Sequence, residues 1–245
     1  MILANVRGRL TPADMGLVVR LLSQGDPARE SRIRGRLAER GRDALLDEPS
    51  LFDLLHHAPG IAAPSAALFI YVGVRHALRR VGLDDTELSD YLSALLLEFG
   101  VRDRALRIAP ADDQVYRYVS EIVADLELVA DARRAFLLRA HLGNFSLWLS
   151  GVFPDYIAAR RVRHGGPDFS YYEAMGARGF RLASDHHLAR EWDLTGVYHR
   201  AAESFERLRV GLNRLSDFVF FRTTSSPDRL MRQVTDTFRL GLADN

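Results

Sequence analysis

The chain has 245 residues, of which 47% are apolar, and its 33 basic and 32 acidic side chains nearly balance, which argues against a general binder of polyanions. It contains no cysteine, so disulfides, thiolate nucleophiles, iron–sulfur clusters and cysteine-ligated zinc are excluded. It also contains no lysine, which excludes Schiff-base and pyridoxal chemistry and a P-loop.

The beginning of the chain carries arginines and no long apolar run, so it does not read as a signal peptide. The most apolar segments, 66–74 and 145–153, are shorter than the roughly 18 residues that a membrane span needs. We therefore expect a cytoplasmic protein with no membrane segment.

Residues that start and stop helices divide the chain into roughly nine or ten helices. The main segments are 11–25, 26–41, 64–81, 84–100, 112–129, 131–153, 168–191 and 194–221, with shorter helices at 50–57, after Pro154 and from Ser226. No segment shows strand alternation bounded by hairpin turns. The sequence therefore predicts an all-α multi-helix bundle without a sheet. We expect one domain over 1–245, in which residues 1–57 can form a small N-terminal helical subdomain packed on the 64–245 bundle.

The segment 194–219 places apolar residues in alternating steps of four and three. They are Leu194, Tyr198, Ala201, Phe205, Leu208, Leu212, Leu215 and Val219. An a/d pattern sustained over more than three heptads is typical of a helix with coiled-coil-like packing. We expect this seam to face the core of the same chain, with a homodimer interface as the alternative.

The segment 141–157 is apolar on most sides and carries small residues at helical spacing, namely Gly143, Ser146, Ser150 and Gly151. Small residues allow a neighbouring helix to approach closely, and Gly176 and Gly179 predict a second such crossing. His141 and Asn144 share a face of this helix. They are interpreted as a hydrogen-bonded core pair, or alternatively as part of a polar pocket for a small ligand. The aromatic-rich segment around Tyr172 is interpreted as a core seam, with an aromatic ligand pocket as the alternative.

Two imidazole–carboxylate pairs lie one helical turn apart, His187 with Glu191 and His199 with Glu203. Helix-borne metal sites need this arrangement, but surface pairs have the same spacing. The Glu-x-x-His and His-Glu-x-x-His motifs are both missing. We expect surface or interhelical bonding, with a metal site in an enzyme or sensor as the alternative.

A basic stripe runs along the predicted second helix, formed by Arg29, Arg32, Arg36 and Arg40. It could contact nucleic acid, although Glu30 and Glu39 dilute its charge and no aromatic residue is interleaved. Nucleotide-cradle and serine-nucleophile motifs do not occur. The sequence thus favours a non-enzymatic interaction or regulatory module, without a cofactor, that binds a protein partner or self-associates. The alternatives are the metal site and the arginine-mediated nucleic-acid contact.

Overall fold

The computed structural model describes residues 1–57, 63–219 and 227–241. Within these ranges the chain is all-helical, with fifteen α-helices, one 3-10 helix and no strand. The helices of the first half are α1 (Val6–Arg9), α2 (Pro12–Ser23), α3 (Pro27–Arg40), α4 (Asp43–Leu46), α5 (Leu51–His57), α6 (Ala66–Arg79), α7 (Thr86–Phe99) and the 3-10 helix η1 (Arg104–Leu106). Those of the second half are α8 (Val119–Leu128), α9 (Ala132–Val152), α10 (Pro154–His164), α11 (Phe169–Ser184), α12 (His187–Glu191), α13 (Thr195–Glu203), α14 (Phe205–Val219) and α15 (Pro227–Leu240).

The all-α class is confirmed, but the expected count of nine or ten helices is too low. Single-turn helices such as α1 and α4 carry too few residues to show a period. The expected helix 168–191 divides into α11 and α12, because the ring of His186 accepts the Leu188 amide at 3.2 Å and starts a new helix. The expected helix 194–221 divides into α13 and α14 at Ser204, and its last two residues lie outside the described ranges. The expected helix 112–129 begins only at Val119.

The N-terminal caps follow the sequence closely. Thr11 and Asp14 form a capping box on α2, with the Asp14 amide donating to the Thr11 hydroxyl at 3.2 Å. Asp26, Asp85, Asp131 and Asp168 cap α3, α7, α9 and α11 with their carboxylates. Of the two adjacent aspartates before α7, Asp85 is the cap, whereas Asp84 pairs with Arg75 and Arg79.

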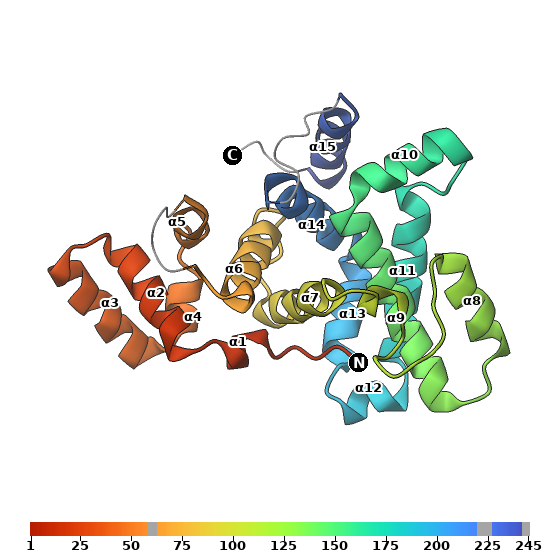
Figure 1. Ribbon diagram of the computed structural model, residues 1–245, viewed down its shortest axis with the longest axis horizontal. Helices are drawn as coiled ribbons and strands as arrows, with labels where there is room; N and C mark the ends of the chain where they lie inside the picture. The colour runs from red at the N-terminus through yellow and green to blue at the C-terminus, as the bar shows by residue number, and fades with distance from the viewer. Residues whose placement is uncertain (58–62, 220–226, 242–245) are drawn as a thin grey trace.

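The molecule is elongated in the view of Figure 1, with α2 to α5 at one end and the larger group of helices α7 to α14 at the other. The long helix α9 is central to that larger group, where it packs against α7, α8, α10, α11 and α14. Helix α6 contacts α1, α5, α7 and α14 and so joins the two ends. The last described helix, α15, lies at the edge above α14, beside α10.

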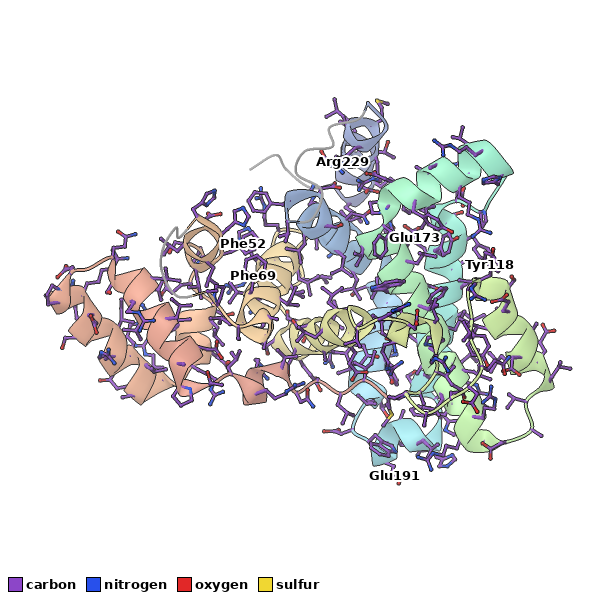
Figure 2. All side chains as sticks on the ribbon, viewed as in Figure 1. Phe52, Phe69, Tyr118, Glu173, Glu191 and Arg229 are labelled. Atoms are coloured by element: carbon purple, nitrogen blue, oxygen red, sulfur yellow. The ribbon has the colours of Figure 1, made fainter. Side chains whose placement is uncertain are left out.

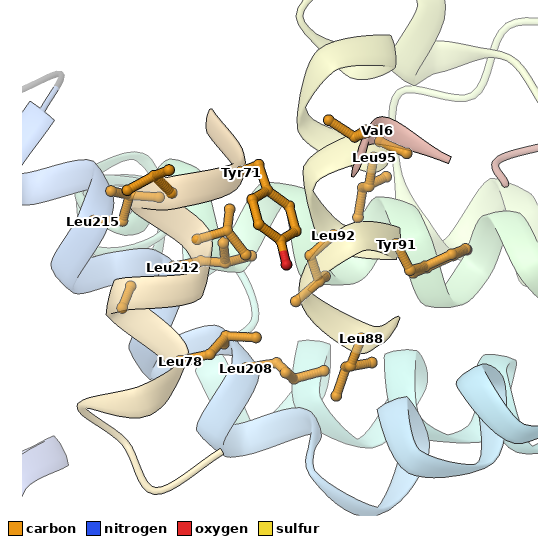
Figure 3. Close-up of a cluster of buried hydrophobic side chains, with 14 of the residues drawn as sticks. Val6, Tyr71, Leu78, Leu88, Tyr91, Leu92, Leu95, Leu208, Leu212 and Leu215 are labelled. Carbon is orange, nitrogen blue, oxygen red and sulfur yellow. The ribbon is translucent and has the colours of Figure 1, made fainter. Parts of the chain in front are cut away.

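The predicted seam faces the core of the same chain. All of its residues except the half-buried Val219 are buried, although the backbone breaks at Ser204. Figure 3 shows Leu212 of α14 facing Tyr71 of α6, and Leu208 directed toward Leu88 of α7. Leu215 packs against Gly73 of α6. The seam residues therefore stabilise the monomer and are not available as a dimer interface.

One cluster of buried apolar side chains extends from Ile2 through α2, α5 and α6 to Leu215. Residues 1–57 thus share an apolar core with the rest of the chain, and their separate standing as a subdomain stays a prediction. None of the helices in the described ranges combines the length and apolar character needed to cross a membrane.

The predicted close crossing between helices is confirmed at α9 and α11. A Cβ on Gly179 would lie 2.6 Å from the Gly143 amide nitrogen and 2.9 Å from the Arg139 carbonyl oxygen. A Cβ on Gly151 would lie 2.9 Å from the Leu212 side chain of α14. Ser150 returns its hydroxyl to the Ser146 carbonyl at 2.6 Å. The small residues of 141–157 therefore bring neighbouring helices close.

Candidate binding groove

Helix α15 leaves its apolar side exposed. Along one face lie Leu230, Val234 and Phe238, which are 62%, 41% and 82% exposed, with Met231 beside them at 63%. The charged side chains Arg229 and Asp236 on the other face are buried. An amphipathic helix that packs on a protein core ordinarily buries its apolar stripe, whereas α15 buries charged side chains and exposes its apolar ones.

Ion pairs hold α15 in this orientation. Asp236 accepts two hydrogen bonds from Arg209 of α14, at 2.7 and 3.0 Å, and Arg209 itself is 1% exposed. Arg232 donates to both carboxylate oxygens of Asp217 at 3.0 Å. Arg229 donates to Asp155 of α10 at 3.0 Å (Figure 2). Because paired buried charges are costly to separate, these contacts explain why the charged face packs inward.

A groove of about 820 Å³ separates α15 from α5, α6 and α14. One apolar wall of the groove is formed by Phe52, Ala77, Leu215 and Phe218. The opposite wall, on α15, is formed by Leu230, Val234 and Phe238. The ring of Phe52 stacks on His76 at 4.7 Å and lies 5.5 Å from Phe218, which gives that wall a continuous aromatic surface. A volume of this size suits a ligand larger than a few water molecules.

Three arginines and two aspartates line the groove, namely Arg80, Arg214, Arg229, Asp53 and Asp217. Asp217 is already paired with Arg229 at 3.3 Å and with Arg232. Arg214 bonds the hydroxyl of Thr237 at 3.1 Å and has no carboxylate partner among the described residues. The groove therefore combines apolar walls with a basic rim.

Burial, and then the charge of Arg80, lowers the pKa of His76. Its imidazole is consequently neutral at pH 7 and adds no charge to the rim. The basic character of the groove comes from the arginines, whose charge does not change over the physiological pH range.

His141 and Asn144, the proposed core pair or ligand pocket, are both buried. Asn144 accepts a hydrogen bond from Tyr91 of α7 at 2.7 Å, and His141 packs between the rings of Phe99, Tyr116 and Phe145. The cavity beside them measures about 10 Å³, no more than one water molecule needs. The described structure therefore favours a core position for both residues, but the expected hydrogen bonding is seen only for Asn144, because His141 Nε2 has no partner among the described residues.

Tyr172, the third candidate for a ligand pocket, is also buried, but it lines a different cavity. That cavity lies at the start of α8 and holds neither His141 nor Asn144. The three candidate ligand residues are therefore divided between the core and a separate cavity.

The His/Glu pairs lie on the outside of the molecule. His199 Nε2 is 3.3 Å from Glu203 Oε1, and both side chains are more than 60% exposed. His187 and Glu191 are exposed on the short helix α12, and Glu191 lies at the tip of the molecule in Figure 2. Within the described ranges no three histidine, aspartate or glutamate side chains gather to hold a metal ion. The metal site remains a sequence-based prediction.

The arginine stripe lies on α3, which buries only Ile33. Arg29, Arg32 and Arg40 are exposed, whereas Arg36 bonds the Ala44 carbonyl at 3.0 Å and pairs with Glu48 at 2.6 Å. One of the four arginines is therefore engaged within the protein. The nucleic-acid contact stays a prediction for the other three.

Comparisons of the chain with protein-family models, with curated proteins and with solved structures each found no match. The groove was not predicted from the sequence, although the spacing of Leu230, Val234 and Phe238 is visible there. Such spacing ordinarily indicates a buried stripe, and only the ion pairs across α15 reveal that it faces outward.

Proposed function

We propose that this protein is a non-enzymatic interaction module whose groove binds an acidic amphipathic helix of a partner protein. The observation that carries the proposal is the orientation of α15, which leaves an apolar stripe exposed above a second apolar wall. Contiguous exposed apolar surface rimmed by polar groups marks interaction sites in soluble proteins.

The apolar stripe supports a helical occupant. Leu230, Val234 and Phe238 recur every four residues and extend over about 12 Å at the rise of an α-helix. A partner helix with apolar residues at the same four-residue spacing could bury them between this stripe and the wall formed by Phe52 and Phe218. This is the helix-in-groove mode of recognition.

The charge of the rim supports an acidic occupant rather than a second copy of this chain. Arg214 stands beside the groove without a carboxylate partner among the described residues, and Arg80 also lines it, against the carboxylate of Asp53. A second copy presenting its own α15 would bring Asp236, but that carboxylate is already used by Arg209. A partner with carboxylates beside its apolar face complements the rim.

Two synthetic helical peptides test the proposal. Both carry leucines at helical spacing, but one is flanked by glutamates and the other by arginines. We expect the acidic peptide to bind the protein about tenfold more tightly, measured by fluorescence anisotropy. The double variant L230S/F238S removes two exposed anchors and should weaken binding of the acidic peptide about tenfold or more.

The matched control is Val162→Ser on α10, which removes an apolar side chain of similar exposure, 85%, away from the groove. It should leave peptide binding unchanged. Equal affinities for the two peptides, or an equal loss in Val162→Ser, would contradict the proposal. A dimer in sedimentation velocity that L230S/F238S dissociates would assign the groove to a second copy and overturn the choice of partner.

A further inference from the structure

A second cavity, separate from the groove, lies where the start of α8 meets α9, α10 and α11. It measures about 200 Å³. Its lining is rich in arginine and tyrosine and comprises Arg117, Tyr118, Val119, Ser120, Leu149, Arg160, Pro167, Tyr171 and Tyr172. Tyr118 lies beside α8, on the opposite side of the larger helix group from α5 (Figure 2). The interaction proposed for the groove does not use this cavity.

Two guanidinium groups of the cavity lack an acidic partner. Arg160 lies over the ring of Tyr118, 4.5 Å from its centroid, and its Nη1 donates to the Tyr156 hydroxyl at 3.4 Å. The side chains of Arg160 and Arg117 form no ion pair among the described residues. Cation–π stacking holds the Arg160 plane in place while leaving other donors of the guanidinium to bind an anion.

The first turn of α8 adds backbone donors to the same cavity. The amides of Val119 and Ser120 have no acceptor among the described residues, as expected for the first positions of a helix. The Glu121 carboxylate accepts the preceding amides, those of Arg117 and Tyr118, at 2.6 and 3.0 Å. Val119 and Ser120 both line the cavity, so the first turn of α8, where the helix dipole favours an anion, borders it.

The hydroxyl of Tyr172 completes the donor set. Tyr172 is 3% exposed, lines the cavity and makes no hydrogen bond to the described residues through its hydroxyl. Burial raises its pKa, more than the nearby charge of Arg160 lowers it, so the hydroxyl is protonated and can donate to a ligand in the cavity.

We propose that this cavity is a binding site for a small phosphomonoester, with the phosphoryl group held by Arg117, Arg160 and the start of α8. The guanidinium groups, backbone amides and tyrosine hydroxyl together offer more hydrogen-bond donors than a carboxylate can accept. A phosphoryl group has three terminal oxygens, which can accept hydrogen bonds from both guanidinium groups. The volume is below the roughly 300 Å³ at which drug-sized pockets begin, which excludes a nucleotide. The rings of Tyr171 and Tyr172 provide an apolar surface for the organic part of the ligand.

Calorimetric titration with inorganic phosphate and with phenyl phosphate tests the site. We expect saturable binding of both, with phenyl phosphate binding more tightly because its ring adds contact with the tyrosines. Arg160→Met should weaken the binding of both probes about tenfold or more, since it removes charged hydrogen bonds. Tyr172→Phe keeps the ring and removes only the hydroxyl, so it should cause a smaller loss.

The control is Arg163→Met, which removes an exposed arginine on the same helix α10 that does not line the cavity. It should leave both affinities within about twofold of the unsubstituted protein. Equal losses in Arg160→Met and Arg163→Met would show general attraction to a basic surface and overturn the proposal. Absence of saturable binding by either probe would also overturn it, and tighter binding of benzoate than of phenyl phosphate would reassign the site to carboxylates.

Discussion

His141 is an imidazole held neutral inside the core. It lies among Phe99, Tyr116 and Phe145, and its Nε2 atom has no hydrogen-bond partner among the described residues. Burial, and to a lesser degree the charge of Arg104, lowers its pKa to about 3. Such a residue links the stability of the fold to pH, because its imidazole binds a proton at a higher pH in the unfolded chain than in the native state.

Stability should fall as the pH drops from 7 to 5, in part because of His141. At pH values between 6.5, the ordinary pKa of histidine, and about 3, the native pKa of His141, the unfolded chain binds more protons than the native state does. The contribution of neutral His141 to the stability of the native state is therefore complete above pH 6.5 and is lost as the pH falls below it. The expected loss is about 2 kcal/mol between pH 7 and pH 5. The difference between urea unfolding of the wild type and of His141→Leu at the two pH values measures it.

His199→Gln is the control for that experiment, since His199 is exposed on the surface of α13. Its pH dependence should match that of the wild type. The burial of an uncharged imidazole at position 141 is contradicted if His141→Leu loses as much stability between pH 7 and 5 as the wild type does.

Helices α9 and α11 approach each other through glycine. Gly143 and Gly179 lie at the contact, and the space for a Cβ on Gly179 is occupied by the backbone of α9. A neighbouring backbone cannot move aside as a flexible side chain can, so the spacing of the two helices depends on the missing side chain.

Gly179→Ala should therefore destabilise the protein by about 1–3 kcal/mol, despite the better helix propensity of alanine. Gly35→Ala is the matched control, because Gly35 lies in the exposed helix α3 with no atom within 4 Å of an added Cβ. That substitution should stabilise by up to about 1 kcal/mol. Chemical denaturation measures both changes, and stabilisation by Gly179→Ala would contradict the close crossing.

At the scale of the whole molecule, a buried charge network determines where α15 lies. Arg209 bonds Asp236 of α15, Glu173 of α11 at 2.6 Å and Asn213 of its own helix at 2.8 Å. Asn213 in turn donates to the carbonyl oxygens at the end of α9. The attachment of α15, and with it the groove, thus depends on polar contacts that connect three helices of the core.

Asp236→Asn should loosen α15 selectively. Removing one partner of a buried ion pair costs about 3 kcal/mol or more, and detachment of α15 lets water reach Arg209 instead. Amide hydrogen exchange in α15 should accelerate about a hundredfold while α9 and α11 keep their protection. Glu203→Gln, which removes an exposed charge paired with His199, should leave exchange in α15 unchanged. Equal acceleration in both variants would contradict the role of the network.

Much of the fold was predictable, because helix caps and apolar periodicity are local. Asp26, Asp131 and Asp168 cap the helices that they were expected to start. Boundaries were missed where a helix breaks without changing the apolar period, as at Ser204. Of the candidate ligand residues, Tyr172 does line a cavity, but its companions Arg117 and Arg160 lie far from it in the sequence and carry no motif.

The sequence by itself determined the helical class, the caps, the buried seam from Leu194 to Leu215 and the close glycine crossings. Each depends on residues within one or two helical turns of one another, or on the size of a single side chain. Only the tertiary structure decided that α15 exposes its apolar face and that Tyr172 is separated from His141. The physical reason is that the partners of α15, Asp155, Arg209 and Asp217, come from other helices. Their ion pairs, in which Arg209 and Asp217 are buried, outweigh the ordinary preference of an amphipathic helix.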